Sequence, residues 1–462
     1  MGQITFEVPP DLHPTLRTGL SRAWFAGGYD SAPVPTTRLD NGNRFTLTRD
    51  ENESGYLCLP WRNADGVERV VSSSTLRLAD RPYAMLLELA RGSVNRVRSV
   101  VAALNSVGLG LPADLAEEIA RVTRAYGRMV SGGETGTAFA CGVIDDAGRM
   151  ADRCAAALTD YRLHARQQAH GALQTRLGCR LSRPLLPADA ELYTQSFNAV
   201  RIVPDWRAIE AHEGVFDWST VEPLVDWAVA ADLDVTIGPL IDLANGRFPD
   251  WVNNWKGDLP NLAAFFTDFL ATVMNRYRDR VRGWHVFAGF NHVDVLGLVE
   301  DDRLRLAARM LECAQEHDSK SERVISMSQP WGDYLTNDDM TYSPLVFSDT
   351  LLRAGLRATS IEIELIGGTN RRGGERRDAL DAIHLFELFD ALGLPLEVVT
   401  CGPGVELLTT AVAAPSVRAV YWDTWSAADP AGRTPSTPLV GADGQPTDTL
   451  RQLQSLRKKW LR

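Results

Sequence analysis

The sequence lacks the features that mark a metal-binding, disulfide-rich or membrane chain. Its cysteines contain no C-x-x-C pair and no histidine partner at metal-ligand spacing, which fits neither a zinc site nor a disulfide framework in a chain of 462 residues. No apolar run approaches the length of a membrane span. We therefore expect reduced thiols, no metal and no membrane insertion. The six cysteines are Cys58, Cys141, Cys154, Cys179, Cys313 and Cys401.

The N-terminal stretch lacks a secretory or lipidation signal. "MGQITFEVPPDLHP" has no basic start followed by an apolar segment, and Phe6 stands where myristoylation needs Ser or Thr. Together with the unpaired cysteines, this start predicts a cytoplasmic protein. No motif indicates a cofactor, and we expect none.

Positive charge is also in short supply. The net charge is -11, whereas a nucleic-acid partner requires a clustered cationic surface. We therefore expect no nucleic-acid partner. The local basic run "RGGERR" (372–377) is interpreted as a solvated loop.

The first third of the chain has two different periodicities. Residues 1–80 alternate short apolar runs with turn residues, which predicts a small β-sandwich, and "DNGN" (40–43) indicates a hairpin because Asn-Gly suits tight turns. Residues 81–172 show apolar residues three to four apart, which predicts a helical segment. Pro82 suits the first turn of its first helix.

Residues 173–462 contain short apolar runs that alternate with helical stretches. Eight such runs match an α/β fold in the form of a (β/α)8 TIM barrel, in both number and length. In such barrels functional residues follow the carboxyl ends of the strands. The runs are "TRLGCRL", "NAVRIV", "LDVTIGPLI", "GWHVFA", "RVISMSQ", "SIEIELI", "LPLEVVT" and "VRAVYWD".

Several stretches of this half resemble glycoside hydrolase family 10, the xylanase family. "FNAVRIVPDWRAIEAHEGVFDWSTVEPLVDWA" (197–228) is similar to the family's second-strand block, and "FPDWV" (248–252) is similar to its Leu-Pro-x-Trp-Val. "GLPLEVVTCGP" (393–403) resembles its seventh strand, and "VYWDTWSAADP" (420–430) resembles its eighth. The resemblance covers most of 173–462. The whole chain also resembles hypothetical xylanase-like proteins with an N-terminal extension.

The resemblance implies retaining hydrolysis of β-1,4 links by two glutamates, an acid/base on the fourth strand and a nucleophile on the seventh. Aligned on Trp284 and Val286, this chain has Gly289 at the acid/base position. Aligned on Thr400, it has Cys401 at the nucleophile position. Both glutamates of the family are therefore expected to be missing.

The sugar-binding residues of the family also differ here. Its Gly-His-x-Leu-Val-Trp-His on the third strand corresponds to "GPLIDLANG" (238–246), and its Glu-Asn on the second strand corresponds to Val203 and Pro204.

Four carboxylates are candidates for a rebuilt catalytic site. Glu362 and Glu364 are two apart, so both point to the same face of their strand, either the barrel interior or the surrounding helices. Asp242 and Asp423 each close an expected strand. Placing Glu362 on the family nucleophile instead would leave "GLPLEVVTCGP" without a role, so we reject that register.

Two further side chains have weaker claims to chemistry. Cys401 lies at a strand end, but a lone cysteine is more often a small buried residue than a nucleophile. His285 alternates with Trp284 along its strand, and we interpret it as a buried, hydrogen-bonded histidine.

Five polar and aromatic residues are predicted ligand contacts. "QPWGDY" (329–334) supplies an amide, an indole and a carboxylate, a combination that suits a sugar because its CH face stacks on aromatic rings while its hydroxyls form hydrogen bonds. The tryptophans of the eighth strand are expected at the barrel mouth. The predicted contacts are Gln329, Trp331, Asp333, Trp422 and Trp425.

Three functional hypotheses remain open. The first is a barrel that has lost xylanase activity and binds a saccharide or similar polar ligand, or acts as a scaffold. The second is a carbohydrate-active hydrolase with a rebuilt site at the barrel mouth. The third is a purely structural interaction protein. Fold alone does not decide among them.

Overall fold

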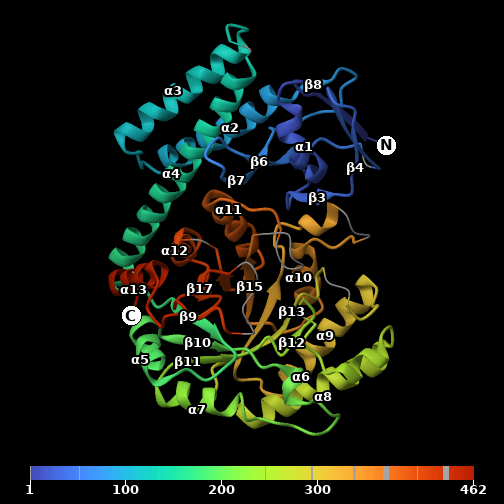
Figure 1. The fold of residues 1–462 in the computed structure, drawn as a ribbon, viewed down its shortest axis with the longest axis vertical. Coiled ribbons are helices and arrows are strands. Elements are labelled where there is room, and N and C mark those ends of the chain that lie inside the picture. Colours follow the sequence, from blue (N-terminus) through green and yellow to red (C-terminus); the bar gives the residue numbers. More distant parts are fainter. Residues whose placement is uncertain are drawn as a thin grey trace. The chain divides into compact units, whose positions relative to one another are not determined.

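The structure is a computed structural model that comprises two compact units. The first unit contains residues 1–161, 331–341 and 375–384, and the second contains residues 162–330, 342–374 and 385–462. Figure 1 traces the chain in sequence colours. The residues described are 2–50, 52–134, 136–244, 246–292, 295–336, 340–367, 374–402, 404–429 and 436–462.

The first unit begins with two four-stranded sheets. One has the strand order β4-β5-β1-β8 and the other has the order β3-β2-β6-β7. The hairpin predicted at 40–43 is confirmed, because the strands on either side of it, β4 and β5, pair antiparallel with Asp40 opposite Phe45. The strands are β1 (Gly2–Glu7), β2 (Trp24–Gly27), β3 (Ala32–Val34), β4 (Thr37–Asp40), β5 (Arg44–Arg49), β6 (Tyr56–Arg62), β7 (Glu68–Ser72) and β8 (Tyr83–Ala84).

Four α-helices accompany these sheets in the described N-terminal part of the chain. Helix α1 (His13–Arg22) lies within a segment predicted to be entirely β, and its Leu16 and Leu20, four residues apart, are buried in the core shared with both sheets. This short helix has too few apolar positions to stand out in the sequence. The segment predicted to be helical after residue 81 contains α2 (Met85–Ser106), α3 (Ala113–Val130) and α4 (Thr137–His170), and α4 continues past Tyr161 into the second unit.

The second unit is a closed (β/α)8 barrel of parallel strands, as predicted. The order is β11-β10-β9-β17-β16-β15-β14-β13, and pairing of β11 with β13 closes it. A short segment, β12 (Ile241–Asp242), continues the third strand beside β13. The strands are β9 (Arg176–Leu181), β10 (Ala199–Ile202), β11 (Asp234–Ile237), β13 (Gly283–Ala288), β14 (Glu322–Met327), β15 (Ser360–Leu365), β16 (Leu396–Thr400) and β17 (Val417–Trp422).

Helices surround these strands (Figure 1). Helix α8 illustrates why they form, since Asp258 caps its first turn and its buried residues, among them Leu262, Phe266 and Phe269, recur every three to four positions. The helices after β9 are α5 (Pro187–Ser196), α6 (Trp206–Ile209), α7 (Glu222–Ala230), η1 (Asp250–Trp255), α8 (Leu259–Tyr277), α9 (Glu300–His317), η2 (Asp333–Thr336), α10 (Pro344–Arg353), α11 (Ala379–Asp390), α12 (Glu406–Ala413) and α13 (Asp448–Trp460). Of these, η2 and the part of α11 up to His384 belong to the first unit.

Candidate functional site

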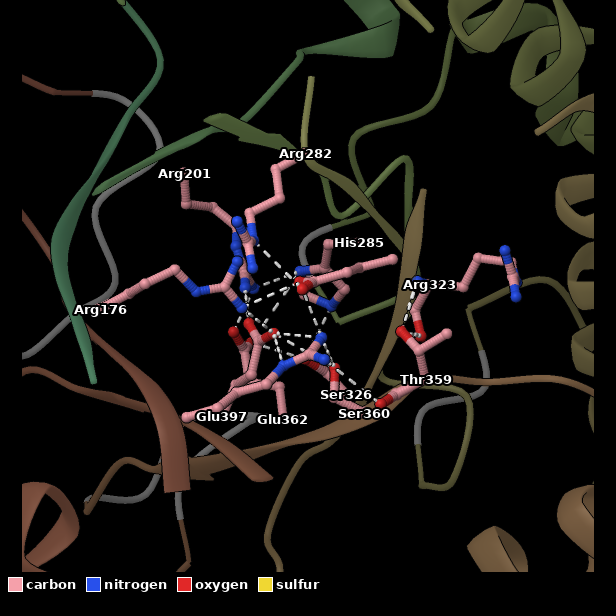
Figure 2. A network of polar contacts seen from close by, with 12 residues as sticks. Arg176, Arg201, Arg282, His285, Arg323, Ser326, Thr359, Ser360, Glu362 and Glu397 are labelled. Carbon is pink, nitrogen blue, oxygen red and sulfur yellow. Dashed lines mark hydrogen bonds and ion pairs between the residues drawn. The ribbon is translucent and has the colours of Figure 1, made fainter. Parts of the chain in front are cut away.

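Charged side chains gather in the barrel interior near the amino ends of the strands (Figure 2). Glu397 of β16 is fully buried and accepts hydrogen bonds from the guanidinium groups of Arg176 (3.3 Å), Arg418 (2.9 Å) and Arg201. The Ser360 hydroxyl donates to the same carboxylate at 3.2 Å. Glu397 is therefore enclosed by positive charge.

This enclosure fixes the protonation of Glu397. Burial alone would raise the pKa of its carboxyl, but the guanidinium groups of Arg201, Arg418 and Arg176 lower that pKa to about 2. The carboxylate is ionised at neutral pH and cannot serve as a proton donor there.

Glu362 lies beside this group and uses both carboxylate oxygens within the protein. Oε2 pairs with Arg201, and Oε1 accepts a hydrogen bond from the Ser326 hydroxyl at 2.6 Å. The Arg201 guanidinium also lies 4.3 Å from the centre of the Tyr421 ring. Of the two orientations considered for Glu362, the structure shows the interior one, with an arginine as partner inside the barrel.

His285 belongs to the same network. Its Nδ1 lies 2.9 Å from Arg201 Nη1, and its Nε2 lies 2.8 Å from Ser326 Oγ and 3.1 Å from the Phe287 carbonyl oxygen. Arginine can only donate, so Nδ1 is the acceptor and Nε2 carries the proton. His285 is buried and hydrogen-bonded, as we interpreted it from the sequence.

Glu364 lies further along β15, toward the carboxyl ends of the strands. It is fully buried and accepts a hydrogen bond from the Ser328 hydroxyl at 2.6 Å. Asn291 fixes the Ser328 backbone, because its amide donates to the Ser328 carbonyl at 2.8 Å and accepts from the Ser328 N–H at 3.3 Å. Glu364 therefore has an ordered neutral hydroxyl as a partner.

Arg180 and Asp423 meet at the carboxyl ends of β9 and β17. Arg180 Nη1 lies 3.7 Å from Asp423 Oδ2, and both side chains are at most 1% exposed. None of the three side-chain nitrogens of Arg180 has a hydrogen-bond partner among the described residues. The ion pair is thus too long to satisfy the guanidinium donors.

Cys401 follows β16 at the same end of the barrel. Burial raises the pKa of its thiol to about 12, and the negative charges of Asp423 and Glu364 act in the same direction, against Arg180. The thiolate is the reactive form of cysteine, so this environment disfavours a nucleophilic role at neutral pH.

Gly289 follows β13 and has no room for a side chain. Its φ is +78°, a conformation that suits glycine, and a Cβ placed on it would lie 2.7 Å from the Ala244 backbone nitrogen and 2.9 Å from the Ala244 Cβ. A larger residue at this position requires the backbone to move.

Asp242 ends β12 and pairs in register with Ala288, the last residue of β13. It is 8% exposed. The structure therefore places it beside the carboxyl end of the fourth strand, as expected for a residue of the barrel mouth.

A segment of this barrel matches a known family. Residues 168–291, which run from before β9 to just after β13, match the model described as glycosyl hydrolase family 10. The barrel resembles glycoside hydrolase family 10.

Solved xylanases are similar to this chain at low identity. A family 10 xylanase from Thermobacillus composti is 16% identical over 61% of this chain and 97% of its own, with a TM-score of 0.45. Xylanase 10B from Thermotoga maritima is 14% identical over 65% and 97%, with a TM-score of 0.47. Xylanase 10B from Thermotoga petrophila, solved with xylobiose, is 13% identical over 62% and 94%, with a TM-score of 0.48.

The order of the strands shows which of them are the fourth and the seventh of the barrel. In barrel order β13 is the fourth strand and β16 is the seventh. Gly289 and Cys401 thus directly follow the two strands that, by the family resemblance, would carry the glutamates. Their assignment to the acid/base and nucleophile positions remains a prediction.

The predicted contacts in "QPWGDY" are divided between the two units. Gln329 belongs to the barrel unit, whereas Trp331 and Asp333 belong to the first unit. There the Asp333 carboxylate accepts from Arg377 at 2.6 Å and from the Glu375 N–H at 2.8 Å. Trp331 lies 5.3 Å from the Arg377 guanidinium. Their role as ligand contacts remains a prediction.

The interpretation of "RGGERR" as a solvated loop is wrong for its last residue. The Arg377 side chain is 7% exposed, and its guanidinium lies 5.1 Å from the centre of the Trp24 ring and 5.3 Å from that of the Trp331 ring. Residues 372 and 373 lie outside the described part of the chain. The buried aromatic and acidic partners of Arg377 are distant in sequence, so the local run of charge gave no sign of them.

Trp422 and Trp425 are both buried. The Trp422 indole donates to the Thr437 carbonyl at 2.8 Å. The Trp425 ring lies 5.3 Å from that of Tyr193 and 6.4 Å from that of Phe197. These contacts of both tryptophans are with other protein groups, and a role in ligand binding remains a prediction.

Sequence reasoning missed the arginines of the barrel interior. Arg176 and Arg180 are four apart in β9, so the period-two argument applied to Glu362 and Glu364 would have placed both arginines on one face. The signal was therefore present in "RLGCRL", beside a further buried arginine, Arg201, in "NAVRIV".

The described residues contain neither a candidate metal site nor a helix that could span a membrane. No group of three or more His, Cys, Asp or Glu side chains there is arranged to hold a metal ion. Likewise, none of the helices in that part of the chain is both long and apolar enough to cross a bilayer.

Proposed function

We propose that this protein is a family 10-like barrel that binds a saccharide or a similar polar ligand at the carboxyl ends of its strands and has lost retaining xylanase activity. The observation that carries this proposal is Gly289. Retaining hydrolysis needs an acid to protonate the leaving oxygen and a carboxylate to trap the anomeric carbon. Gly289 supplies no proton, and the adjacent Ala244 backbone leaves no space for a glutamate.

The nucleophile position supports the same proposal. Cys401 is a buried thiol with a raised pKa, so it offers no anion to attack the sugar at neutral pH. Two of the interior carboxylates, Glu362 and Glu397, are engaged by Arg201 and hydroxyl donors. These two carboxylates therefore form contacts within the protein and are not available to a substrate.

A second candidate function is a hydrolase with a rebuilt site. The observation that favours it is that the charges of Glu364 and Asp423 both raise the pKa of Cys401, so two carboxylates act on the residue at the predicted nucleophile position. A glycosidase needs at least one such pair of carboxylates. Asp242 is the third carboxylate near this end of the barrel.

A hydrolysis assay separates the two functions. Purified protein is incubated with xylan and with aryl β-xylosides, beside the variants Glu364→Gln, Asp423→Asn, Asp242→Asn and Glu362→Gln. The proposed function predicts no turnover above buffer for any of them. Turnover that is abolished by one substitution and kept by the others would establish the rebuilt enzyme.

A thermal-shift series then separates a binder from a scaffold. A ligand that binds only the native state stabilises it by RT ln(1 + [L]/Kd), about 2.7 kcal/mol at a hundredfold excess over Kd. The proposed function predicts a concentration-dependent rise in Tm with xylo-oligosaccharides. A constant Tm across neutral and acidic sugars would favour the purely structural role.

A further inference from the structure

Arg180 is a buried guanidinium group whose hydrogen-bonding capacity the described protein does not use. It is 1% exposed, and its Nε, Nη1 and Nη2 atoms make no hydrogen bond to the described residues. Its one ion pair, to Asp423, spans 3.7 Å. Its place near the end of β9 puts it where a barrel of this kind binds its ligands.

An unsatisfied arginine in a barrel is unusual for a physical reason. The guanidinium is always charged and carries five N–H donors in a planar fork, and each buried donor without an acceptor loses the hydrogen bond it made to water. Arg176 and Arg201 each have one buried nitrogen without a partner among the described residues, but both donate to Glu397, whereas none of the three side-chain nitrogens of Arg180 has such a partner. Arg180 is the exception at the ligand-binding end.

The charges around Arg180 restrict what can bind to it. Asp423 is its ion-pair partner. The charges of Asp423 and Glu364 raise the pKa of the Cys401 thiol, and the charge of Arg180 lowers it. The Asp423 carboxylate therefore already opposes the charge of Arg180. A ligand anion that approached Arg180 would also approach the Asp423 carboxylate at short range, where charge repulsion is strong. Neutral oxygen acceptors carry no such penalty.

We propose that Arg180 is a ligand-binding residue that donates hydrogen bonds to adjacent hydroxyl oxygens of an uncharged polyol, and that the same site rejects acidic sugars. The inference rests on the proposed saccharide-binding function and deepens it. The planar fork of Arg180 matches two neighbouring oxygens, a geometry that a lysine ammonium does not reproduce.

Isothermal titration calorimetry at pH 7 tests this proposal. The probes are xylobiose and a disaccharide of the same size that carries a glucuronic acid unit. Wild-type protein is expected to bind xylobiose and not the acidic disaccharide. Arg180→Lys is expected to weaken xylobiose binding about 10- to 100-fold, because hydrogen bonds from a charged donor are lost. Arg305→Lys, a matched change at an exposed arginine, is expected to leave Kd unchanged.

A second variant distinguishes a loss of binding from a loss of folding. Arg180→Met with Asp423→Leu removes both members of the ion pair, which leaves no uncompensated charge of that pair in the interior. It is expected to fold, as judged by circular dichroism, and not to bind xylobiose.

Each contrary result has a distinct meaning. Xylobiose binding that is equal in wild type and in both Arg180 variants would overturn the role of Arg180 and leave the proposed function standing. Arg180-dependent binding of the acidic disaccharide would overturn the preference for an uncharged ligand. If neither sugar binds the wild-type protein, the proposed function fails, and this inference fails with it.

Discussion

At Gly289 the backbone has a φ of +78°, and Ala244 lies against the position where a side chain would begin. A side chain there meets two costs, a left-handed backbone and a close contact with main-chain atoms. The lack of a side chain at Gly289 is therefore imposed by the local backbone as well as by the amino-acid type.

Gly289→Ala should lower the free energy of unfolding by about 1–3 kcal/mol, because it combines positive φ with overpacking. The matched control is Gly402→Ala, since no atom lies within 4 Å of a Cβ added at Gly402. We expect the control to change stability by less than about 0.5 kcal/mol. Urea unfolding of both variants provides the measurement, and equal midpoints would show that the position is not closed.

The raised pKa of the Cys401 thiol leads to a second prediction. At pH 8 its thiolate is scarce, since the pKa is about 12, and the side chain is buried. Iodoacetamide should therefore leave Cys401 unmodified in the native protein and label it after unfolding in urea. Half-buried Cys141 is the internal comparison and should react first. Rapid native labelling of Cys401, detected by peptide mass spectrometry, would refute the protonated, inaccessible thiol.

At the scale of elements, the barrel strands combine apolar runs with inward charges. The apolar pattern was sufficient to predict all eight strands and their order of appearance. The ion pairs between β9, β10, β15 and β16 were not predicted, because partners such as Arg201 and Glu362 are 161 residues apart. Only closure of the sheet brings them together.

The Glu397 cluster predicts how the barrel responds to acid. Its folded pKa of about 2 lies below the unfolded value of about 4.3, so its contribution is present above pH 4.3 and is lost as the pH falls toward 2. The contribution at neutral pH is about 3 kcal/mol on this basis. Glu397→Gln should therefore be less stable than wild type at pH 7, with a difference that shrinks toward pH 2.

Urea unfolding at a series of pH values measures this dependence. Glu117→Gln removes a negative charge from the exposed face of α3 and serves as the charge control. A difference between Glu397→Gln and wild type that is constant from pH 7 to pH 2 would rule out the proposed linkage.

At the scale of the whole molecule, the compact units combine segments that are distant in the sequence. The predicted parts 1–80, 81–172 and 173–462 follow local pattern, whereas the first compact unit also contains 331–341 and 375–384. Local periodicity cannot reveal such membership, because it depends on contacts between distant segments. In the same way, the alignment predicted that Gly289 stands at the acid position, while the lack of space for a side chain there could be seen only from the position of Ala244.

Arg377 provides the test of this organisation. It bonds to Asp333, and its guanidinium lies close to the rings of Trp24 and Trp331; all four residues belong to the first unit. Arg377→Met leaves the Asp333 carboxylate without its guanidinium and should cost about 3–5 kcal/mol, as for a broken buried pair.

Urea unfolding followed by tryptophan fluorescence measures this loss. Arg353→Met, at a side chain that is 80% exposed, should have little effect. Similar unfolding midpoints for the two variants would show that Arg377 does not hold these segments together.

The cytoplasmic location and the exact extent of each domain stay predictions from the sequence. We propose that the barrel keeps its strands and no longer catalyses the reaction that needs two glutamates.

The most direct test of that claim is covalent trapping. A retaining glycosidase forms a glycosyl-enzyme intermediate, and an activated 2-fluoro-xyloside makes that intermediate long-lived enough to weigh by intact-protein mass spectrometry. A barrel that lacks both glutamates should show an unchanged mass after prolonged incubation. A stoichiometric increase of one fluoroxylosyl group, mapped to Glu364, Asp423 or another carboxylate of the barrel, would contradict it.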